Sequence, residues 1–253
     1  MMTTTPPSPT TGAPAPPNPS TLVPSAQILV FGHLAWLGFV WLAATVVYAV
    51  VVACVARWGS VDASLWQSVV AGWQRYVIFG AGVTIATTFM RMLVRNGVTR
   101  RTLSHAAAIA MGVIGVAVAI WNVVGFAVER VVYDANDWPQ VLRSDTVFEW
   151  GDLPRAAIDS GLVVAAYYSV GWIVGVCFYR WGVIGGLLRL LPALVPAALM
   201  ELVVSPDFGG LDVDVVASWR DRPPVLVPLA AGAALLAVTV WVARRLTQEA
   251  AVH

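Results

Sequence analysis

The side chains that most often perform catalysis or bind metals are few and widely separated in this chain. The histidines are His33, His105 and His253, and no HExxH pattern places two of them on one helix face to bind zinc. The two cysteines, Cys54 and Cys177, are too few for a disulfide framework or a cysteine-rich zinc site. We therefore predict that the chain is not an enzyme and carries no metal or cofactor of its own.

Lysine does not occur among the 253 residues, and all fifteen basic residues are arginine. A P-loop needs a lysine to reach the β- and γ-phosphates of a nucleotide. The chain therefore contains no P-loop, and if the protein uses ATP, another chain must bind it. No GxSxG pattern is present either, so the sequence offers no nucleophile elbow.

The acidic residues lie mainly between the apolar runs, in 129–157 and 205–224. We interpret these stretches as solvated outer loops, with weak calcium binding as the alternative. Within the apolar runs the acids are Asp159 and Glu201, each near the end of a run. A proton-coupled carrier is expected to place an acid near the bilayer midplane, so this class is not favoured. An intramembrane glutamate protease is also disfavoured, because no run carries paired glutamates with a downstream arginine.

The composition is that of an integral membrane protein. Hydrophobic residues make up 58% of the chain and charged residues 11%, whereas a soluble domain carries about 25% charged residues. A chain with so little charge cannot cover a water-facing surface, so we expect lipid to solvate much of it. The net charge of +1 gives no general attraction to nucleic acid, and we predict no nucleic-acid partner.

A helix that crosses a bilayer needs about 20 predominantly apolar residues. Six such runs are present, at 29–56, 69–94, 105–128, 158–179, 183–204 and 225–243. They predict an all-α integral membrane protein with six transmembrane helices over 26–246, joined in part by short cytoplasmic helices. Residues 1–25 hold eight of the sixteen prolines and are predicted to be a disordered cytoplasmic tail. Residues 247–253 are predicted to be a cytoplasmic C-terminal tail.

The arginines favour one orientation of these spans. With the N-terminus in the cytoplasm, the short connections 95–104 and 180–182 carry dense positive charge on the cytoplasmic side. The positive-inside rule counts basic residues in short loops close to spans, and acidic residues contribute little. We therefore predict a multi-pass protein of the cytoplasmic membrane with both termini in the cytoplasm.

Three features inside the spans bear on packing. Gly171 and Gly175 form a GxxxG pattern that permits close helix approach. Pro192 and Pro196 are expected to kink or break the fifth span. Arg75 and Arg189 lie within apolar runs but near their ends, so we expect their side chains to snorkel to the interface, with a polar contact along an inner seam as the alternative.

The strongest local pattern joins the second and third spans, from Arg91 to Leu103. Gly97 is expected to break the backbone after the second helix. Thr99 is well placed as the N-cap of a short helix that starts with Arg100 and Arg101. The result would be a basic elbow at the membrane surface.

This stretch resembles a connection found in a known family. Asn96-Gly-Val-Thr-Arg-Arg-Thr-Leu103 is similar to the LGVTRRxF connection of small permeases of type-2 ATP-binding-cassette (ABC) exporters, especially actinobacterial ones, with Asn96 where a leucine is usual. Gly175-Val-Cys-Phe-Tyr-Arg-Trp-Gly182 is similar to the GxxxxRWG that separates their fourth and fifth spans. The segment 183–189 is less basic than in that family.

The resemblance implies that this chain is the permease subunit of an ABC exporter. Both cytoplasmic connections would dock on a separate ABC ATPase subunit, and a second permease copy or a sibling permease would complete the path. The implied ATPase-coupling residues are Arg95, Asn96, Gly97, Val98, Thr99, Arg100, Arg101, Arg180, Trp181 and Gly182.

Two alternatives stay open. Arg95, Arg100 and Arg101 are also the residues expected of a topology anchor that binds anionic membrane lipid. The whole chain would equally suit a membrane scaffold or accessory protein without transport activity. The sequence names no substrate, because apolar, glycine-rich spans suit lipids, amphipathic peptides and hydrophobic drugs as well as plain helix–helix interfaces.

Overall fold

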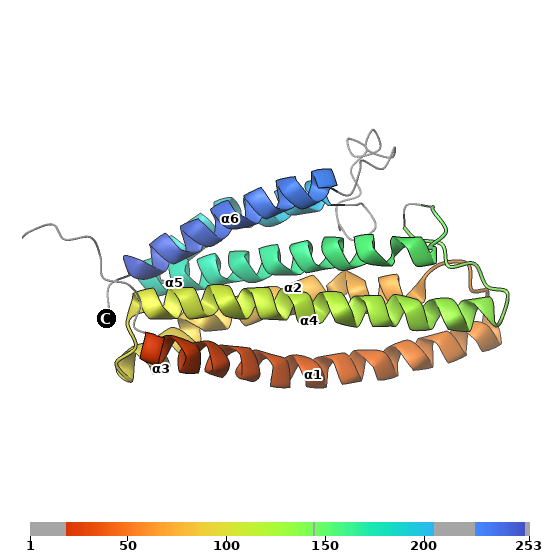
Figure 1. Cartoon of the computed structure of the whole chain (residues 1–253), viewed down its shortest axis with the longest axis horizontal. Helices are drawn as coiled ribbons and strands as arrows, with labels where there is room; N and C mark the ends of the chain where they lie inside the picture. The colour runs from red at the N-terminus through yellow and green to blue at the C-terminus, as the bar shows by residue number, and fades with distance from the viewer. Residues whose placement is uncertain (1–18, 144, 205–225, 251–253) are drawn as a thin grey trace, which may run out of the picture.

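The computed structural model describes residues 19–143, 145–204 and 226–250, and these are almost entirely helical (Figure 1). The helices are α1 (Pro19–Trp58), η1 (Gln67–Ala71), α2 (Gly72–Thr84), η2 (Ile85–Phe89), α3 (Met90–Arg95), α4 (Arg100–Asp134), η3 (Trp150–Asp152), α5 (Leu153–Val203) and α6 (Leu226–Gln248). The elements from η1 to α3 follow one another without a gap and form one helical segment, with π-helical turns at η1 and η2.

Five of the described helical segments are long and apolar enough to cross a membrane, which agrees with the predicted membrane character. Their outward faces carry large apolar side chains that water would not solvate. Phe31, Phe39 and Leu42 on α1 are 65–72% exposed, and Ile184 and Leu191 on α5 are 77–78% exposed. Exposed apolar surface of this extent is the mark of a lipid-facing or partner-facing protein.

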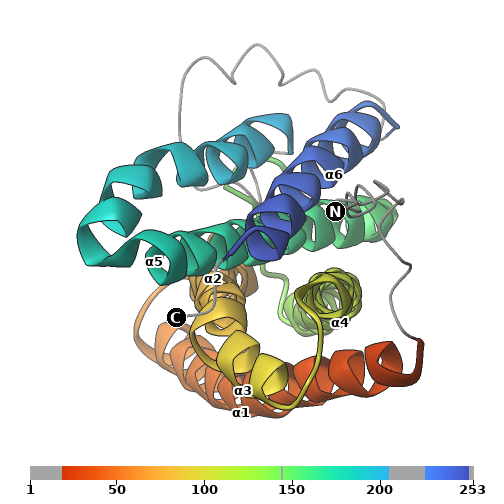
Figure 2. The same cartoon turned by 90° about the vertical axis from the view of Figure 1, so that its left-hand side faces the viewer.

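The long helix α5 doubles back on itself at Gly182. This residue has φ 65° and ψ −168°, a left-handed conformation that glycine adopts without a Cβ clash. The hydroxyl of Tyr167 donates a hydrogen bond to Glu201, although 34 residues of straight helix would separate them by about 50 Å. Figure 2 shows the two parts, 153–181 and 183–203, lying side by side. The helix continues through Pro192 and Pro196, so the turn lies at the glycine rather than at the prolines.

The closest helix contact joins α2 and η2 to α5. A Cβ atom added at Gly171 would lie 2.1 Å from the backbone oxygen of Phe79, and one at Gly175 would lie 2.7 Å from that of Val83. Only glycine permits backbones to approach this closely. The close approach predicted from the GxxxG pattern is therefore confirmed.

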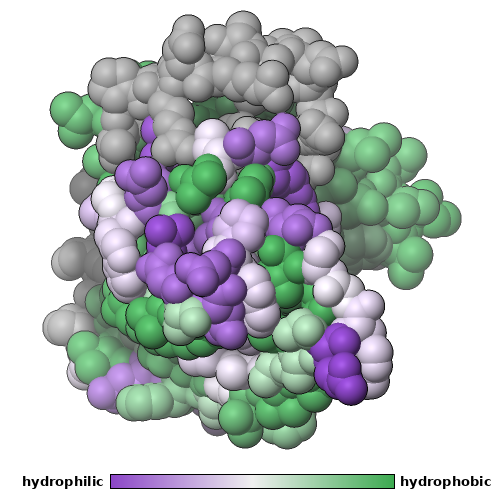
Figure 3. Space-filling model, turned by 90° about the vertical axis from the view of Figure 1, so that its right-hand side faces the viewer, coloured by the Kyte–Doolittle hydropathy of each residue, from purple (hydrophilic) through white to green (hydrophobic). Residues whose placement is uncertain are grey.

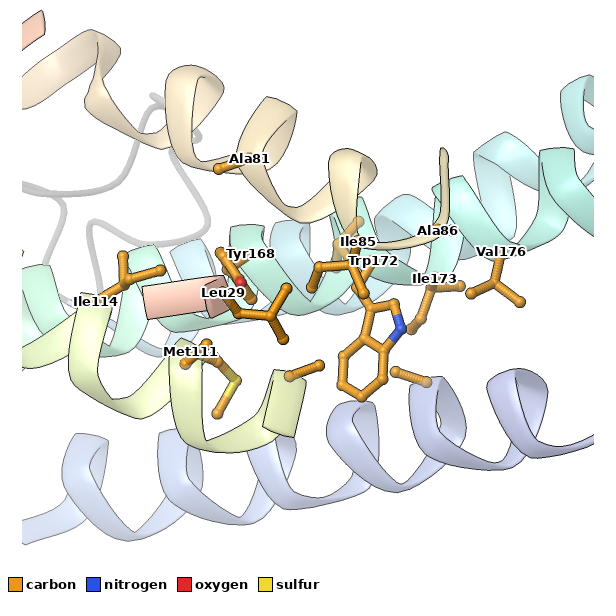
Figure 4. Packing of buried hydrophobic residues seen from close by; sticks show 14 of the residues in the cluster. Leu29, Ala81, Ile85, Ala86, Met111, Ile114, Tyr168, Trp172, Ile173 and Val176 are labelled. Atoms are coloured by element: carbon orange, nitrogen blue, oxygen red, sulfur yellow. The ribbon is translucent and has the colours of Figure 1, made fainter. Parts of the chain in front are cut away.

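Around this contact the main core draws on all five long helical segments that the structure describes (Figure 4). Trp172 and Tyr168 from α5 are fully buried, with Ile85 from η2, Leu29 from α1 and Ile114 from α4 packed around them. The bundle thus buries Trp172 and Tyr168 at the contact between α2 and α5, while other large apolar side chains cover its outer faces.

Several predicted boundaries differ from the structure. α1 begins at Pro19, so 19–25 belong to a helix and not to a disordered tail; 1–18 lie outside the described residues. Arg100 and Arg101 form the first turn of the long α4, and no separate short helix exists in the 96–99 connection. α4 also continues to Asp134, so Glu129 belongs to a helix and not to a loop. α6 continues to Gln248, into the predicted C-terminal tail. The predicted loop 205–224 and the last residues, 251–253, lie outside the described residues.

The bundle has two ends, which are named for the residues that lie there. The arginine-rich end is where α3 ends at Arg95 and α6 ends at Gln248. The loop end is where α1 ends at Trp58 and α4 ends at Asp134. They lie at opposite ends of the long axis in Figure 1.

Candidate functional site at the arginine-rich end

The 96–99 connection is a tightly hydrogen-bonded turn. The backbone N–H of Gly97 donates to Val94 at 3.0 Å and that of Val98 donates to Leu93 at 3.0 Å, which together make a Schellman motif. Gly97 has φ +80°, as the motif requires. Thr99 then caps α4, because its Oγ1 accepts a hydrogen bond from the N–H of Thr102 at 3.1 Å. The predicted backbone break at Gly97 and the predicted N-cap at Thr99 are confirmed.

This turn presents polar groups while one side chain holds it to the bundle. Arg95, Asn96, Gly97 and Thr99 are exposed, whereas Val98 is half-buried against the main core. The backbone geometry and the packing of Val98 therefore hold a small polar surface in a defined position.

Arg100 and Arg101 instead line a cavity of about 450 Å³ between α4 and α6. We call it the arginine cavity. Its lining consists of Arg100, Arg101, Trp241, Arg244, Arg245 and Gln248. Four arginines from two helices thus line one space, and among the described residues that line it none is acidic.

Hydrogen bonds fix the walls of the arginine cavity. Nδ1 of His105 lies 2.7 Å from the backbone oxygen of Arg101, and Nε2 of His105 lies 2.6 Å from Nη2 of Arg244. Since a backbone oxygen can only accept, Nδ1 carries the proton and Nε2 accepts from Arg244. Gln248 also donates to Ser104 at 3.3 Å. The guanidinium of Arg245 lies 5.5 Å from the ring centre of Trp241.

The predicted residues at the α5 turn hold the end of α6. Arg180 donates to the backbone oxygen of Leu246 at 3.3 Å and lies 3.6 Å from the carboxylate of Glu249. Trp181 receives two guanidinium groups, that of Arg180 at 4.6 Å and that of Arg189 at 4.0 Å from its ring centre. Trp181 and Gly182 are themselves exposed.

The structure therefore divides the predicted site residues into two groups. Exposed positions are Arg95, Asn96, Gly97, Thr99, Trp181 and Gly182. Arg100, Arg101 and Arg180 instead lie against the last turns of α6, and Val98 lies against the core. The end of α6 contacts both predicted cytoplasmic connections. Gln248 forms a hydrogen bond with α4, and the backbone oxygen of Leu246 accepts one from α5.

A second polar cluster, which sequence reasoning missed, lies toward the loop end. Glu129 is fully buried, and we call its surroundings the Glu129 network. Its carboxylate accepts from Ser64 Oγ at 2.5 Å, Trp66 N at 2.6 Å, Gln140 Nε2 at 2.8 Å and Tyr48 OH at 3.2 Å. Four donors match the roughly four lone-pair sites of a carboxylate. This network ties α1, α4 and the loops that flank them into one unit.

A buried ion pair lies next along the bundle. Nη1 of Arg75 donates to Glu201 at 2.9 Å, and both side chains are less than 10% exposed. Arg75 therefore does not snorkel to the interface, and the inner polar contact is the correct alternative. Arg189, in contrast, is exposed and bonds to the backbone of its own helix at Gly185.

Neutral polar groups lie beside the ion pair of Arg75 and Glu201. Gln74 and Asn122 exchange two hydrogen bonds of 3.2 Å, and with Arg75 and Ser160 they line a space of about 10 Å³. A periodic signal was available in the sequence. Asn122 and Glu129, like Ser160 and Tyr167, are seven residues apart and so share one helix face.

The loop end also carries a hydrophilic surface (Figure 3). Across 19–143, 145–204 and 226–250, no three histidine, cysteine, aspartate or glutamate side chains lie close enough together to hold a metal ion. The alternative of calcium binding at 205–214 falls outside these ranges.

Comparisons with protein families, with characterised proteins and with solved structures returned no match.

Proposed function

We propose that this chain is the permease subunit of an exporter, with ATP hydrolysed by a separate ABC ATPase chain. The observation that supports this most is the placement of two connections far apart in sequence. Residues 96–99 and 180–182 each contain a left-handed glycine, lie at the same end of the bundle and expose part of their backbone there. A partner protein could contact both connections at once.

In this proposal the chain crosses the membrane six times, with 153–181 and 183–203 as separate spans. The arginine-rich end faces the cytoplasm, in keeping with the positive-inside rule. The arginines at that end are Arg91, Arg95, Arg100, Arg101, Arg180, Arg189, Arg244 and Arg245. The loop end, with its hydrophilic surface, faces outward, and both termini are cytoplasmic.

The exposed and the buried predicted residues then take different roles. Arg95, Asn96 and Trp181 provide contacts for the ATPase. Arg180 transmits movement of the α5 turn to α6 through its bond to Leu246. Because the two connections join at the end of α6, closure of an ATPase pair would displace several helices together.

The substrate path in this proposal lies between two permease copies or between this chain and a sibling permease. The polar space inside one copy, between Gln74, Arg75 and Asn122, measures about 10 Å³, which is room for one water at most. In this proposal the substrate therefore moves along the outer faces of the helices, and those faces are apolar and exposed among the described residues.

A scaffold or accessory protein without transport activity is the second candidate. It is favoured by the buried ion pair of Arg75 and Glu201, which holds three helical segments together across the bundle interior. A protein that only positions partners in the membrane needs this rigidity and no path.

Co-purification separates the two candidates. The full-length chain, tagged and expressed at native level, is extracted in mild detergent and its partners are identified by mass spectrometry. We expect a separate chain with a Walker A motif and ATPase activity in the eluate. The double variant Arg95→Ala with Gly97→Val should reduce this ATPase at least fivefold, because it removes a contact and strains the φ +80° turn.

The matched control is Arg57→Ala, which removes an exposed arginine at the loop end and should leave the ATPase in place. A stable complex without any ATPase would favour the scaffold. Equal loss in the control would mean that the connection is not the docking surface.

A further inference from the structure

We propose that the arginine cavity is a binding site for the phosphate group of an anionic membrane phospholipid. The site is distinct from the exposed 95–99 surface and does not depend on the ATPase proposal. It is built by α4 and α6, which meet at the arginine-rich end (Figure 2).

The lining of the cavity has the chemistry of a phosphate site. Arg100, Arg244 and Arg245 bring planar guanidinium groups to one space, and guanidinium forks bind phosphate oxygens in pairs. The cavity also lies at the N-terminus of α4, where the helix dipole favours an anion. Its volume of about 450 Å³ falls in the range of sites that hold small organic molecules, so it can take a headgroup and not only an ion.

Two of the guanidinium groups are also held in place by neighbouring side chains. His105 holds the guanidinium of Arg244 through a 2.6 Å hydrogen bond, and Trp241 lies under that of Arg245. An arginine that only fixes the orientation of a transmembrane helix needs no such support, because any position near the lipid headgroups would fix it equally well. Here two side chains restrict where the positive charge lies.

The cavity lies where both helices change from exposed apolar side chains to arginine. On α6, Val238 and Trp241 are 58–59% exposed, and Arg244 and Arg245 follow within one turn. On α4, Ile109 is already 46% exposed about two turns after Arg101. Both helices therefore pass from apolar surface to arginine at the same level, which is where the phosphates of a bilayer lie. A lipid phosphate fits this position better than a soluble one, since its acyl chains can lie on the adjoining apolar faces.

Native mass spectrometry of the purified full-length chain tests the proposal. The protein in detergent is titrated with phosphatidylglycerol and, separately, with phosphatidylcholine. We expect a preference for phosphatidylglycerol of about tenfold or more. The double variant Arg244→Gln with Arg245→Gln should reduce this preference to within about twofold.

Two further variants serve as controls. Arg91→Gln with Arg95→Gln removes the same charge from exposed positions at the same end and should keep the preference. Arg244→Lys with Arg245→Lys keeps the charge but loses the fork geometry, so an intermediate preference is expected. The lysine variant also keeps the test informative if the glutamine variant does not fold.

Four outcomes would overturn the assignment. The preference could survive in the glutamine variant, or it could fall equally in the Arg91 and Arg95 control, which would indicate a general surface effect. Millimolar inorganic phosphate could displace the lipid completely, which would make a soluble phosphate the ligand. Loss of a co-purifying ATPase from the glutamine variant with an unchanged lipid preference would instead assign the cavity to that partner.

Discussion

The two ends of this bundle differ in where their charged side chains lie. Toward the loop end, Glu129 is fully buried with four donors, and Arg75 is paired with Glu201 away from water. At the arginine-rich end, Arg95 is exposed, and four other arginines surround an open cavity without an acidic residue in its described lining. The loop end therefore buries two charged groups with their partners beneath a hydrophilic surface, whereas the arginine-rich end gathers arginines around an open cavity.

The difference indicates different roles. A buried charge that has all its partners fixes the arrangement of the chain, and removing one partner is costly. Charges that gather at an exposed end or around a cavity repel one another and gain most when an anion arrives. We therefore assign stability to the loop end and binding to the arginine-rich end. Substitutions at both ends test this division, and the largest effect is expected at Glu129.

Glu129→Leu should be the most damaging substitution. It leaves Ser64, Gln140 and the backbone N–H of Trp66 without their acceptor in a fully buried site. We expect a loss of about 4 kcal/mol in stability, since each unsatisfied buried donor costs about 1–3 kcal/mol. Thermal unfolding in detergent measures this.

Glu129→Gln is the matched control, because it keeps the shape and one acceptor oxygen. Its loss should be about half as large. If both variants unfold like the unaltered protein, the Glu129 network does not stabilise the loop end.

The ion pair of Arg75 and Glu201 gives the next effect. Arg75→Met should cost about 3 kcal/mol, because it leaves Glu201 buried without its cation. The double variant Arg75→Met with Glu201→Leu should recover most of that loss, since an apolar pair of similar volume needs no partner. A double-mutant cycle on denaturation in detergent supplies the comparison. A double variant no more stable than the single one would show that the pair is not the reason for the loss.

The sequence predicted the arginine-rich end better than the loop end, because the features of the arginine-rich end depend on residues that are close together in the chain. Gly97 and Thr99 act through their own backbone and the next few residues, so their types alone indicated a turn and a cap. The GxxxG pattern likewise needs only a neighbouring helix. These features were predicted correctly, although the prediction of a separate short helix was wrong.

The loop end depends on partners that are distant in sequence. Glu129 lies 63 residues from Trp66, and Arg75 lies 126 residues from Glu201. Nothing near Glu129 indicates that it is buried, and its position just beyond an apolar run suggested a solvated loop. The seven-residue spacing to Asn122 marks a shared face but does not identify what that face contacts.

Orientation gives a test with no expected change in stability. Single cysteines at Ser60 and at Asn96, in a background with Cys54→Ala and Cys177→Ala, mark the two ends at exposed positions. A membrane-impermeant maleimide added to intact cells should label Ser60→Cys and not Asn96→Cys. Labelling of Asn96→Cys alone would reverse the topology and place the arginine-rich end outside.

The smallest expected effect concerns Arg180, which belongs to the arginine-rich end but contacts a neighbour as the loop-end charges do. Its partner Glu249 is 62% exposed, so the pair should add less than about 1 kcal/mol to global stability. Its bond to Leu246, however, holds the last turn of α6 against α5. Arg180→Gln should therefore leave the unfolding temperature almost unchanged and raise hydrogen exchange in 244–250 severalfold, with no change around Glu129. Arg189→Gln, which removes the other guanidinium that lies over Trp181, is the control and should not alter exchange in 244–250. If Arg180→Gln instead lowered global stability as much as Arg75→Met, the two ends would not differ in kind, and the division between a stabilising end and a binding end would fail.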